Sequence, residues 1–194
     1  ILEPTPITPL AKFGLKYGHP GLLIKREDQT ASVYGGNKVR NLEYLFRDAR
    51  AKGSNTLVTA APLGSNFVSA LAAQAAKSDF QIEVHQFYPK LSPQMQSHDR
   101  FSKTFGGNFI EHQSANYMLG ATKAFLNSKK QALLQPNYYW IAPGGSSWLG
   151  ALGHLMAIKE MGAQQVPDYI VVGLGTGGTM AGLLAGIKYY GLKT

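Results

Sequence analysis

The sequence predicts an α/β protein whose strands lie mostly parallel, and three observations carry this prediction. Short β-branched or aromatic runs alternate with longer segments in which apolar residues recur every three or four positions, the spacing of a helix with one buried face. Glycine-rich turns join several of the apolar runs to the segments that follow them, as strand-to-helix turns do. Strands that alternate with helices in this way form parallel sheets with right-handed crossovers.

The first forty residues predict an arm, a strand and a turn. Pro6 and Pro9 punctuate residues 5–10, which we expect to be extended because proline fixes its backbone and cannot donate a hydrogen bond. Residues 22–25 form a short apolar run before the turn-rich residues 27–36, and this pattern predicts a strand followed by a loop.

The rest of the chain predicts a regular alternation of helices and strands. A helix is expected over residues 38–52, because apolar residues recur there at helical spacing and Gly53 is a natural C-cap. The predicted strands beyond it cover residues 56–60, 82–87, 109–110, 138–141 and 169–172. One predicted helix begins at Ser65 or Asn66, and two others cover residues 93–105 and 115–134. Two more are predicted from the apolar faces of residues 149–156 and 180–187.

The composition excludes several classes of protein. A hydrophobic content of 44% over 194 residues is enough for a folded core, so a disordered chain is not expected. The absence of cysteine excludes disulfides, thiolate metal sites and cysteine nucleophiles. No apolar run is long enough to span a membrane, and residues 1–10 do not resemble a signal peptide. We therefore expect a soluble cytoplasmic protein with no membrane partner.

The positive charge does not predict a nucleic-acid surface. The formal net charge is +8, but the 19 Lys and Arg residues are scattered and do not interleave with aromatic residues, as a stacking platform would require. An anionic small ligand fits the charge equally well. The five histidines show no ligand spacing, so no metal site is expected, and we interpret them as ordinary surface, turn or helix residues.

Lys38 is the first candidate site residue. Gly35, Gly36 and Asn37 precede it, and glycine permits the sharp turn and close backbone approach that a ligand site needs. The dipole of the predicted helix disfavours a cation in the first turn. This effect lowers the pKa of a lysine and makes its amine a better nucleophile, one route to a Schiff-base lysine. The alternative is an exposed lysine on a capped helix.

The second candidate is the glycine-rich turn of residues 173–179. It joins an apolar run to a helix, so backbone N–H groups and the helix dipole converge where a phosphate would bind. Its glycines fit the dinucleotide fingerprint, but no acidic residue follows Asp168 to bind a ribose. The turn also lacks the lysine of a nucleoside-triphosphate loop. A tight structural turn remains an alternative. A monophosphate together with a separate lysine nucleophile indicates pyridoxal phosphate.

Four segments, taken in order, resemble the 1-aminocyclopropane-1-carboxylate deaminase/D-cysteine desulfhydrase family. They are residues 35–40 (GGNKVR), 64–66 (GSN), 144–153 (GGSSWLGALG) and 175–179 (GTGGT). These are pyridoxal-phosphate enzymes of fold type II, similar to the tryptophan synthase β subunit. The resemblance covers nearly the whole chain but only the front part of a family member.

The resemblance implies a set of site residues. Lys38 would form the internal aldimine with pyridoxal 5′-phosphate, and Asn66 would hydrogen-bond the 3′ oxygen of its ring. Ser65 would face the substrate, whose carboxylate would be received by backbone N–H groups at the start of the same helix. Simple helix capping is the alternative for both Ser65 and Asn66. The phosphate would be bound by Gly175, Thr176, Gly177, Gly178 and Thr179.

Two positions depart from the family pattern. Phe67 stands where the family usually places glutamine or histidine, a position that bears on the substrate. Asn41 stands where family members commonly carry a lysine, so a positive charge near the phosphate is absent.

The resemblance also implies two open parallel-sheet units. We expect a small unit over residues 41–145 and a larger, incomplete unit made of residues 1–40 and 146–194, with the cofactor in the cleft between them. The expected function is a deaminase or lyase that acts on a small amino acid, by ring opening or β-elimination, in a homodimer. A truncated paralogue that binds the cofactor without turnover is an alternative, and a nicotinamide-dependent enzyme is a further one.

Overall fold

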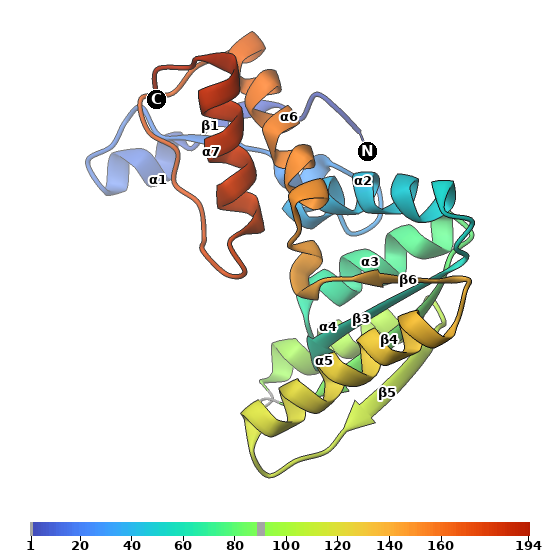
Figure 1. Ribbon diagram of the computed structural model, residues 1–194. Coiled ribbons are helices and arrows are strands. Elements are labelled where there is room, and N and C mark those ends of the chain that lie inside the picture. Colours follow the sequence, from blue (N-terminus) through green and yellow to red (C-terminus); the bar gives the residue numbers. More distant parts are fainter. Residues whose placement is uncertain (1, 89–91) are drawn as a thin grey trace.

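A parallel four-stranded sheet forms the centre of the molecule (Figure 1). The computed structural model describes residues 2–88 and 92–194; residue 1 and residues 89–91, which fall in the two predicted units, lie outside the described residues. The strand order is β5-β4-β3-β6, and each neighbouring pair is parallel. The predicted α/β class with a parallel sheet is therefore confirmed.

The sheet strands and their helices alternate as the periodicity predicts. The strands are β3 (Thr56–Pro62), β4 (Gln81–Phe87), β5 (Asn108–His112) and β6 (Tyr138–Ile141). The helices are α2 (Asn37–Ala51), α3 (Asn66–Lys77), α4 (Pro93–Lys103) and α5 (Tyr117–Leu134). Each predicted element of this part is present, with its ends shifted by a few residues.

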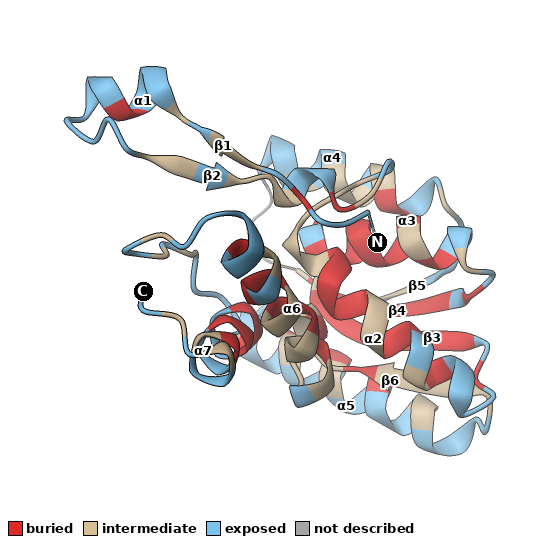
Figure 2. Ribbon diagram, turned by 90° about the horizontal axis from the view of Figure 1, so that it is seen from above, coloured by how far each residue is buried: buried red, intermediate tan, exposed pale blue. Residues whose placement is uncertain are grey.

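Strand β3 is buried on both faces, which explains its continuous apolar sequence. Leu57 and Ala61 belong to the large core that α2 and α3 build over one face of the sheet. Ala60, between them, packs with Phe87 and with Ala124 of α5 on the other face. The red interior of Figure 2 marks this core. The sheet thus holds the start of α2 and the start of α3 in fixed positions.

The N-terminal arm forms a two-stranded hairpin. Strand β1 (Ile7–Pro9) pairs antiparallel with β2 (Leu23–Lys25), and the short helix α1 (Ala11–Lys16) lies between them in sequence. Figure 2 shows the hairpin reaching out from the body of the molecule. The extended arm and the strand are as predicted, whereas α1, only six residues long, is not anticipated by any periodic pattern in the sequence.

Two helices follow the sheet. Helix α6 (Trp148–Gln164) packs against α7 (Gly178–Tyr190) through Ile158, Met161 and Leu183. Helix α6 also contacts α2 (Figure 1), so the second helix pair is joined to the sheet unit through α2. Among residues 2–88 and 92–194, no helix combines the length and the apolar character that crossing a membrane requires.

The strand predicted over residues 169–172 is wrong. Tyr169 and Val171 are 87% and 95% exposed, and the segment has no strand geometry. Ile170 and Val172 pack loosely against the α6–α7 core. An apolar run becomes a strand only when a neighbour accepts and donates its backbone hydrogen bonds, and no strand of the described residues pairs with this one.

Candidate functional site

Lys38 lies in the first turn of α2, directly after a turn that only glycine can form. A Cβ atom on Gly35 would stand 2.0 Å from the backbone oxygen of Asp28, a distance that no real side chain tolerates. The close approach folds the preceding loop against the start of α2. Lys38 itself is half-buried.

Burial gives the Lys38 amine an unusual character. Desolvation of the side chain lowers the pKa of Lys38 below the ordinary value of a lysine. The direction agrees with the sequence prediction, although burial rather than the helix dipole is its main cause. A lowered pKa means that more of the amine is uncharged, and therefore nucleophilic, at neutral pH.

The residue before Lys38 connects it to the glycine-rich turn. Asn37 Nδ2 donates a hydrogen bond to Thr179 Oγ1 at 3.0 Å, across 142 positions of sequence. Thr179 is buried in the first turn of α7. The start of α2 and the start of α7 therefore lie side by side, so the residue before Lys38 contacts the segment that carries the predicted phosphate turn.

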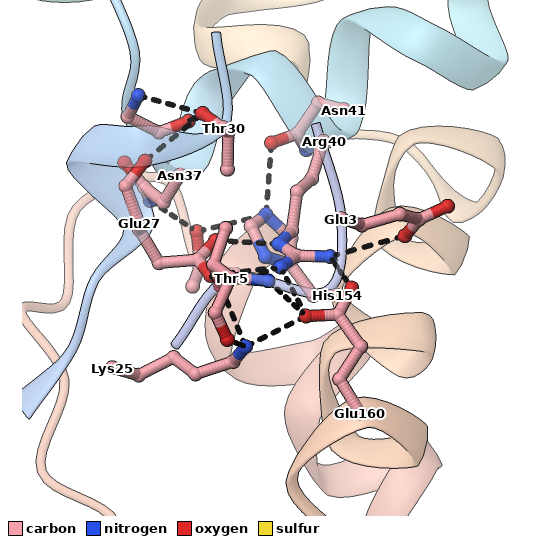
Figure 3. A network of polar contacts seen from close by, with 12 residues as sticks. Glu3, Thr5, Lys25, Glu27, Thr30, Asn37, Arg40, Asn41, His154 and Glu160 are labelled. Carbon is pink, nitrogen blue, oxygen red and sulfur yellow. Dashed lines mark hydrogen bonds and ion pairs between the residues drawn. The ribbon is translucent and has the colours of Figure 1, made fainter. Parts of the chain in front are cut away.

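A buried histidine completes this connection (Figure 3). His154 of α6 places its Nε2 atom 2.8 Å from Asn41 Oδ1 and 3.3 Å from Thr179 Oγ1. Asn41 Nδ2 donates to the backbone oxygen of Gly145, so Asn41 Oδ1 is the acceptor and His154 Nε2 carries the proton. Thr179 Oγ1 accepts from Asn37 Nδ2 and faces the Nε2 proton of His154. Neither of these two contacts uses the hydroxyl proton of Thr179.

His154 is uncharged at neutral pH. Its burial, together with the positive charges of Lys38 and Arg40, lowers the pKa of His154 to about 4. An uncharged imidazole can sit beside a lysine without repulsion. The sequence indicated no more than an ordinary histidine here, and the structure places it in the polar core of the site.

The start of α7 has the features of an anion site. Gly177 adopts left-handed backbone geometry with a φ of 84° and precedes the helix, whose first N–H groups have no acceptor within the helix. Gly175 and Thr176 are exposed beside it. Ser146 Oγ donates to the backbone oxygen of Thr176 at 3.1 Å, which fixes the turn against residues 143–145. Backbone N–H groups and the helix dipole at such a terminus attract a phosphate.

Ser65 and Asn66 stand at the start of α3. Ser65 occupies the N-cap position, yet within the described residues its hydroxyl makes no capping hydrogen bond. Asn66 is exposed, and its Oδ1 atom accepts a hydrogen bond of 2.9 Å from the hydroxyl of Tyr34. Because Tyr34 directly precedes the glycine turn, the segment from Tyr34 to Lys38 contacts both predicted clusters, through Asn66 and through Thr179.

The two departures from the family pattern have structural roles. Phe67 is buried in the core beneath α2, and its ring would lie 3.1 Å from a Cβ atom on Gly145. Its side chain therefore packs inside rather than lining an open surface. Asn41 is also fully buried and joins α2 to Gly145 and α6.

A buried ion network anchors the other face of α2 (Figure 3). The Arg40 side chain is 0% exposed and bonds to Glu27 at 2.5 and 2.8 Å and to Glu160 at 2.8 and 2.9 Å. Lys25 and Thr5 join the same cluster. Burial opposes the charge of Arg40, but the hydrogen bonds that it donates to Glu27 and Glu160 outweigh this effect and raise the pKa of Arg40. The network ties the N-terminal hairpin, α2 and α6 together behind Lys38.

The sequence predicts Lys38, Ser65, Asn66 and the turn of residues 175–179 as site residues. The structure brings the segments that carry them together at the start of α2. The sequence did not identify Tyr34, Asn37 or His154. Tyr34 and Asn37 are close to Lys38 in the sequence, but their hydrogen-bond partners, Asn66 and Thr179, are far away along the chain.

The comparisons with known proteins point to one family. The family model described as "Pyridoxal-phosphate dependent enzyme" matches residues 1–194. A protein of Thermotoga maritima, provisionally named a 1-aminocyclopropane-1-carboxylate deaminase, is 33% identical over 191 residues. That alignment covers 97% of this chain and 60% of the relative. A D-cysteine desulfhydrase of Yersinia pestis is 32% identical, with 93% of this chain and 57% of the relative covered. The chain spans less than two thirds of the length of these curated relatives.

Solved structures agree on the fold. A crystal structure described as an ACC deaminase homologue has a TM-score of 0.85 and 29% identity, and the match covers 100% of this chain and 59% of that one. A threonine deaminase isoform from Solanum lycopersicum has a TM-score of 0.70 at 18% identity, covering 98% of this chain and 48% of the other, which supports the fold alone. Both structures share the fold of this chain over nearly its whole length.

The residues present fit the cofactor of that family. A half-buried lysine of lowered pKa suits an aldehyde, and the start of α7 with the Thr179 hydroxyl suits a phosphate. Hydrogen bonds hold the segments that carry these two groups together. On its sequence, its fold and the chemistry of this site, the chain belongs to the family of pyridoxal-phosphate dependent enzymes.

Proposed function

We propose that this chain carries the cofactor-binding part of a deaminase or desulfhydrase that acts on a small amino acid of the 1-aminocyclopropane-1-carboxylate or D-cysteine type. The observation that carries the proposal is the meeting of three segments at the start of α2. Asn37 bonds to Thr179 of the glycine-rich turn, and Tyr34 bonds to Asn66 at the start of α3. Lys38 directly follows Asn37 in the first turn of α2.

Each residue has a chemical task in the proposal. Lys38 would hold the cofactor at its aldehyde carbon, and its lowered pKa favours the uncharged amine that this role needs. The N–H groups of residues 175–179 and the Thr179 hydroxyl hold the phosphate. Asn66 donates to the ring hydroxyl oxygen. Each task suits the chemistry of the residue that performs it. The phosphate is bound by N–H groups and a hydroxyl, so the glycine-rich turn needs no lysine or arginine.

The substrate is held at the start of α3. Its carboxylate binds at the N-terminus of α3, where the first N–H groups of the helix donate hydrogen bonds to it. The Ser65 hydroxyl, which makes no capping hydrogen bond within the described residues, donates another. When bound, pyridoxal phosphate supplies a ring that withdraws electrons from the bond to be broken. With the cofactor bound, the Lys38 amine would take up and return protons at the α or β carbon of the substrate.

We also propose the division into two units. Residues 41–145 contain the whole four-stranded sheet, and residues 1–40 with 146–194 contribute the hairpin, α6 and α7. The buried contacts between Asn41, Gly145 and His154 lie at the boundary of the two units. The candidate site lies beside the same boundary.

Absorption spectroscopy tests the binding step. Pyridoxal phosphate is added to the wild-type chain, to Lys38→Ala and to the control Lys52→Ala, whose lysine is 61% exposed at the far end of α2. We expect a visible band that borohydride bleaches in the wild type and in Lys52→Ala but not in Lys38→Ala. An equal band in all three proteins would contradict the role of Lys38.

A second assay separates turnover from binding. D-cysteine and 1-aminocyclopropane-1-carboxylate are each incubated with the loaded protein, and release of ammonia and keto acid is measured. Product from either substrate, absent with Lys38→Ala, supports the proposed reaction. Cofactor binding without any product supports instead a chain that binds pyridoxal phosphate without turnover.

A further inference from the structure

We infer that Tyr34 and His98 are positioning residues that fix which side of the Asn66 amide faces the cofactor. The inference deepens the proposed function and rests on it, because that proposal makes Asn66 the neighbour of the ring hydroxyl oxygen. Neither Tyr34 nor His98 needs to touch the cofactor. Their effect passes through the hydrogen bonds of one hydroxyl group.

The hydroxyl of Tyr34 lies between the two other side chains. It is 2.9 Å from Asn66 Oδ1 and 2.8 Å from His98 Nδ1. The three residues come from the turn before α2, from the start of α3 and from the middle of α4. The chain of contacts therefore joins the turn before Lys38 to α3 and to α4.

The aromatic ring of Tyr34 is held independently of these hydrogen bonds. It stacks on Phe101 with a centroid distance of 4.8 Å and meets the His98 ring edge-on at 6.1 Å. Its backbone has a φ of 51°, which a residue other than glycine adopts only when its surroundings impose it. The ring is thus fixed by packing, and the hydroxyl can serve as a rigid connector.

The single proton of the hydroxyl allows two arrangements. In the first, Tyr34 donates to Asn66 Oδ1 and accepts a hydrogen bond from a protonated His98 Nδ1. The amide nitrogen of Asn66 then remains free to donate elsewhere. In the second, Tyr34 donates to His98 Nδ1, and the Asn66 amide must turn over to donate to Tyr34.

Only the first arrangement suits the proposed cofactor. The ring hydroxyl oxygen of pyridoxal phosphate needs a hydrogen-bond donor, and the Asn66 amide offers one only when its oxygen faces Tyr34. That orientation is the one found, since Asn66 Oδ1 is the acceptor of the Tyr34 bond. It requires the proton of His98 to be on Nδ1.

The other ring nitrogen of His98, Nε2, has no contact that would select the tautomer among the described residues. His98 Nε2 is buried, and within the described residues no hydrogen-bond partner lies near it. The contact with Tyr34 therefore decides the tautomer. We expect His98 to be protonated on Nδ1, the less common tautomer of a free imidazole.

Nitrogen NMR tests the proton position without any cofactor. The chain is labelled with ¹⁵N-histidine, and the signals of His98 are assigned as those lost in His98→Asn. We expect the shifts of an imidazole protonated at Nδ1, and Tyr34→Phe should move them. A neutral ring protonated at Nε2 in the wild-type chain would overturn the inference.

Cofactor affinity tests the consequence. Pyridoxal phosphate binding is measured by equilibrium dialysis for the wild type, Tyr34→Phe, His98→Leu and the double variant. We expect each single variant to bind about 3- to 10-fold more weakly, the size of one lost hydrogen bond. The double variant should be no weaker than the single ones, because both act through the same hydroxyl. In His98→Asn an amide nitrogen replaces Nδ1 and should restore part of the loss.

The control is Tyr189→Phe, whose ring is 75% exposed on α7 and whose affinity should equal that of the wild type. If Tyr34→Phe also binds as tightly as the wild type, while the cofactor still attaches to Lys38, the inference fails and the proposed function stands. If the wild-type chain binds no pyridoxal phosphate, both fail.

Discussion

Replacing Arg40 with methionine should remove much of the stability that holds the N-terminal hairpin and α6 on α2. The guanidinium is 0% exposed and makes two hydrogen bonds to each of two carboxylates. Those carboxylates, of Glu27 and Glu160, are only 21% and 10% exposed. Without Arg40 they lose their main counter-charge in a site that water reaches poorly.

The expected cost follows from that geometry. Removing one partner of a buried ion pair leaves an uncompensated charge and costs about 3–5 kcal/mol. Lys25 Nζ stays 2.6 Å from Glu160, so the lower end of the range is the better expectation for this network. We therefore predict that Arg40→Met lowers the free energy of unfolding by about 3 kcal/mol.

Urea denaturation at neutral pH measures this quantity. Arg26→Met is the matched control, because Arg26 forms a similar two-bonded pair with Asp28 in which the side chains are 36% and 57% exposed. An exposed pair contributes about 0–1 kcal/mol. A loss of under about 1 kcal/mol in Arg40→Met, or equal losses in both variants, would refute the claim that the buried network holds the N-terminal hairpin and α6 on α2.

Three further predictions concern the same elements. Gly35→Ala should lower the free energy of unfolding by about 1–3 kcal/mol through its clash, whereas Gly21→Ala, with nothing within 4 Å, should be neutral in the same urea titration. Burial opposes the charge of Glu160, but its hydrogen bonds to two cations lower its pKa to about 2 from 4.5; the stability it contributes is present above pH 4.5 and lost as the pH falls toward 2. Glu160→Gln should therefore flatten the pH dependence of stability in that window. Competitive acetylation across pH should show Lys38 reacting with a midpoint below the ordinary pKa of a lysine, because burial lowers the pKa of Lys38; a midpoint at or above that ordinary value would contradict the shift.

Much of the fold was predictable because it rests on local patterns. The period of apolar residues located α2 and α5, and the compact apolar run of β3 indicated a strand. The same logic failed for residues 169–172, where the composition suits a strand but no paired neighbour is present in the described part of the chain. Side-chain type alone does not reveal whether a partner strand exists.

The candidate site was predictable in its residues but not in its connections. The glycine turns and the lysine carry chemical signatures that can be read locally. The contacts that join them cannot, because Asn37 meets Thr179 across 142 positions and His154 meets Asn41 across 113. His154 has only apolar or small neighbours one helical turn away, at residues 150 and 158, so no spacing marked it as part of a site. Only the packing of α6 on α2 brings it there.

The most direct test of the central claim is a peptide map of the chain after borohydride reduction with pyridoxal phosphate. We predict that the reduced cofactor is found on the peptide that contains Lys38, at about one equivalent per chain, and that inorganic phosphate in excess slows the labelling by competing for the start of α7. Labelling spread over exposed lysines such as Lys52, with Lys38 unmodified, would contradict the account.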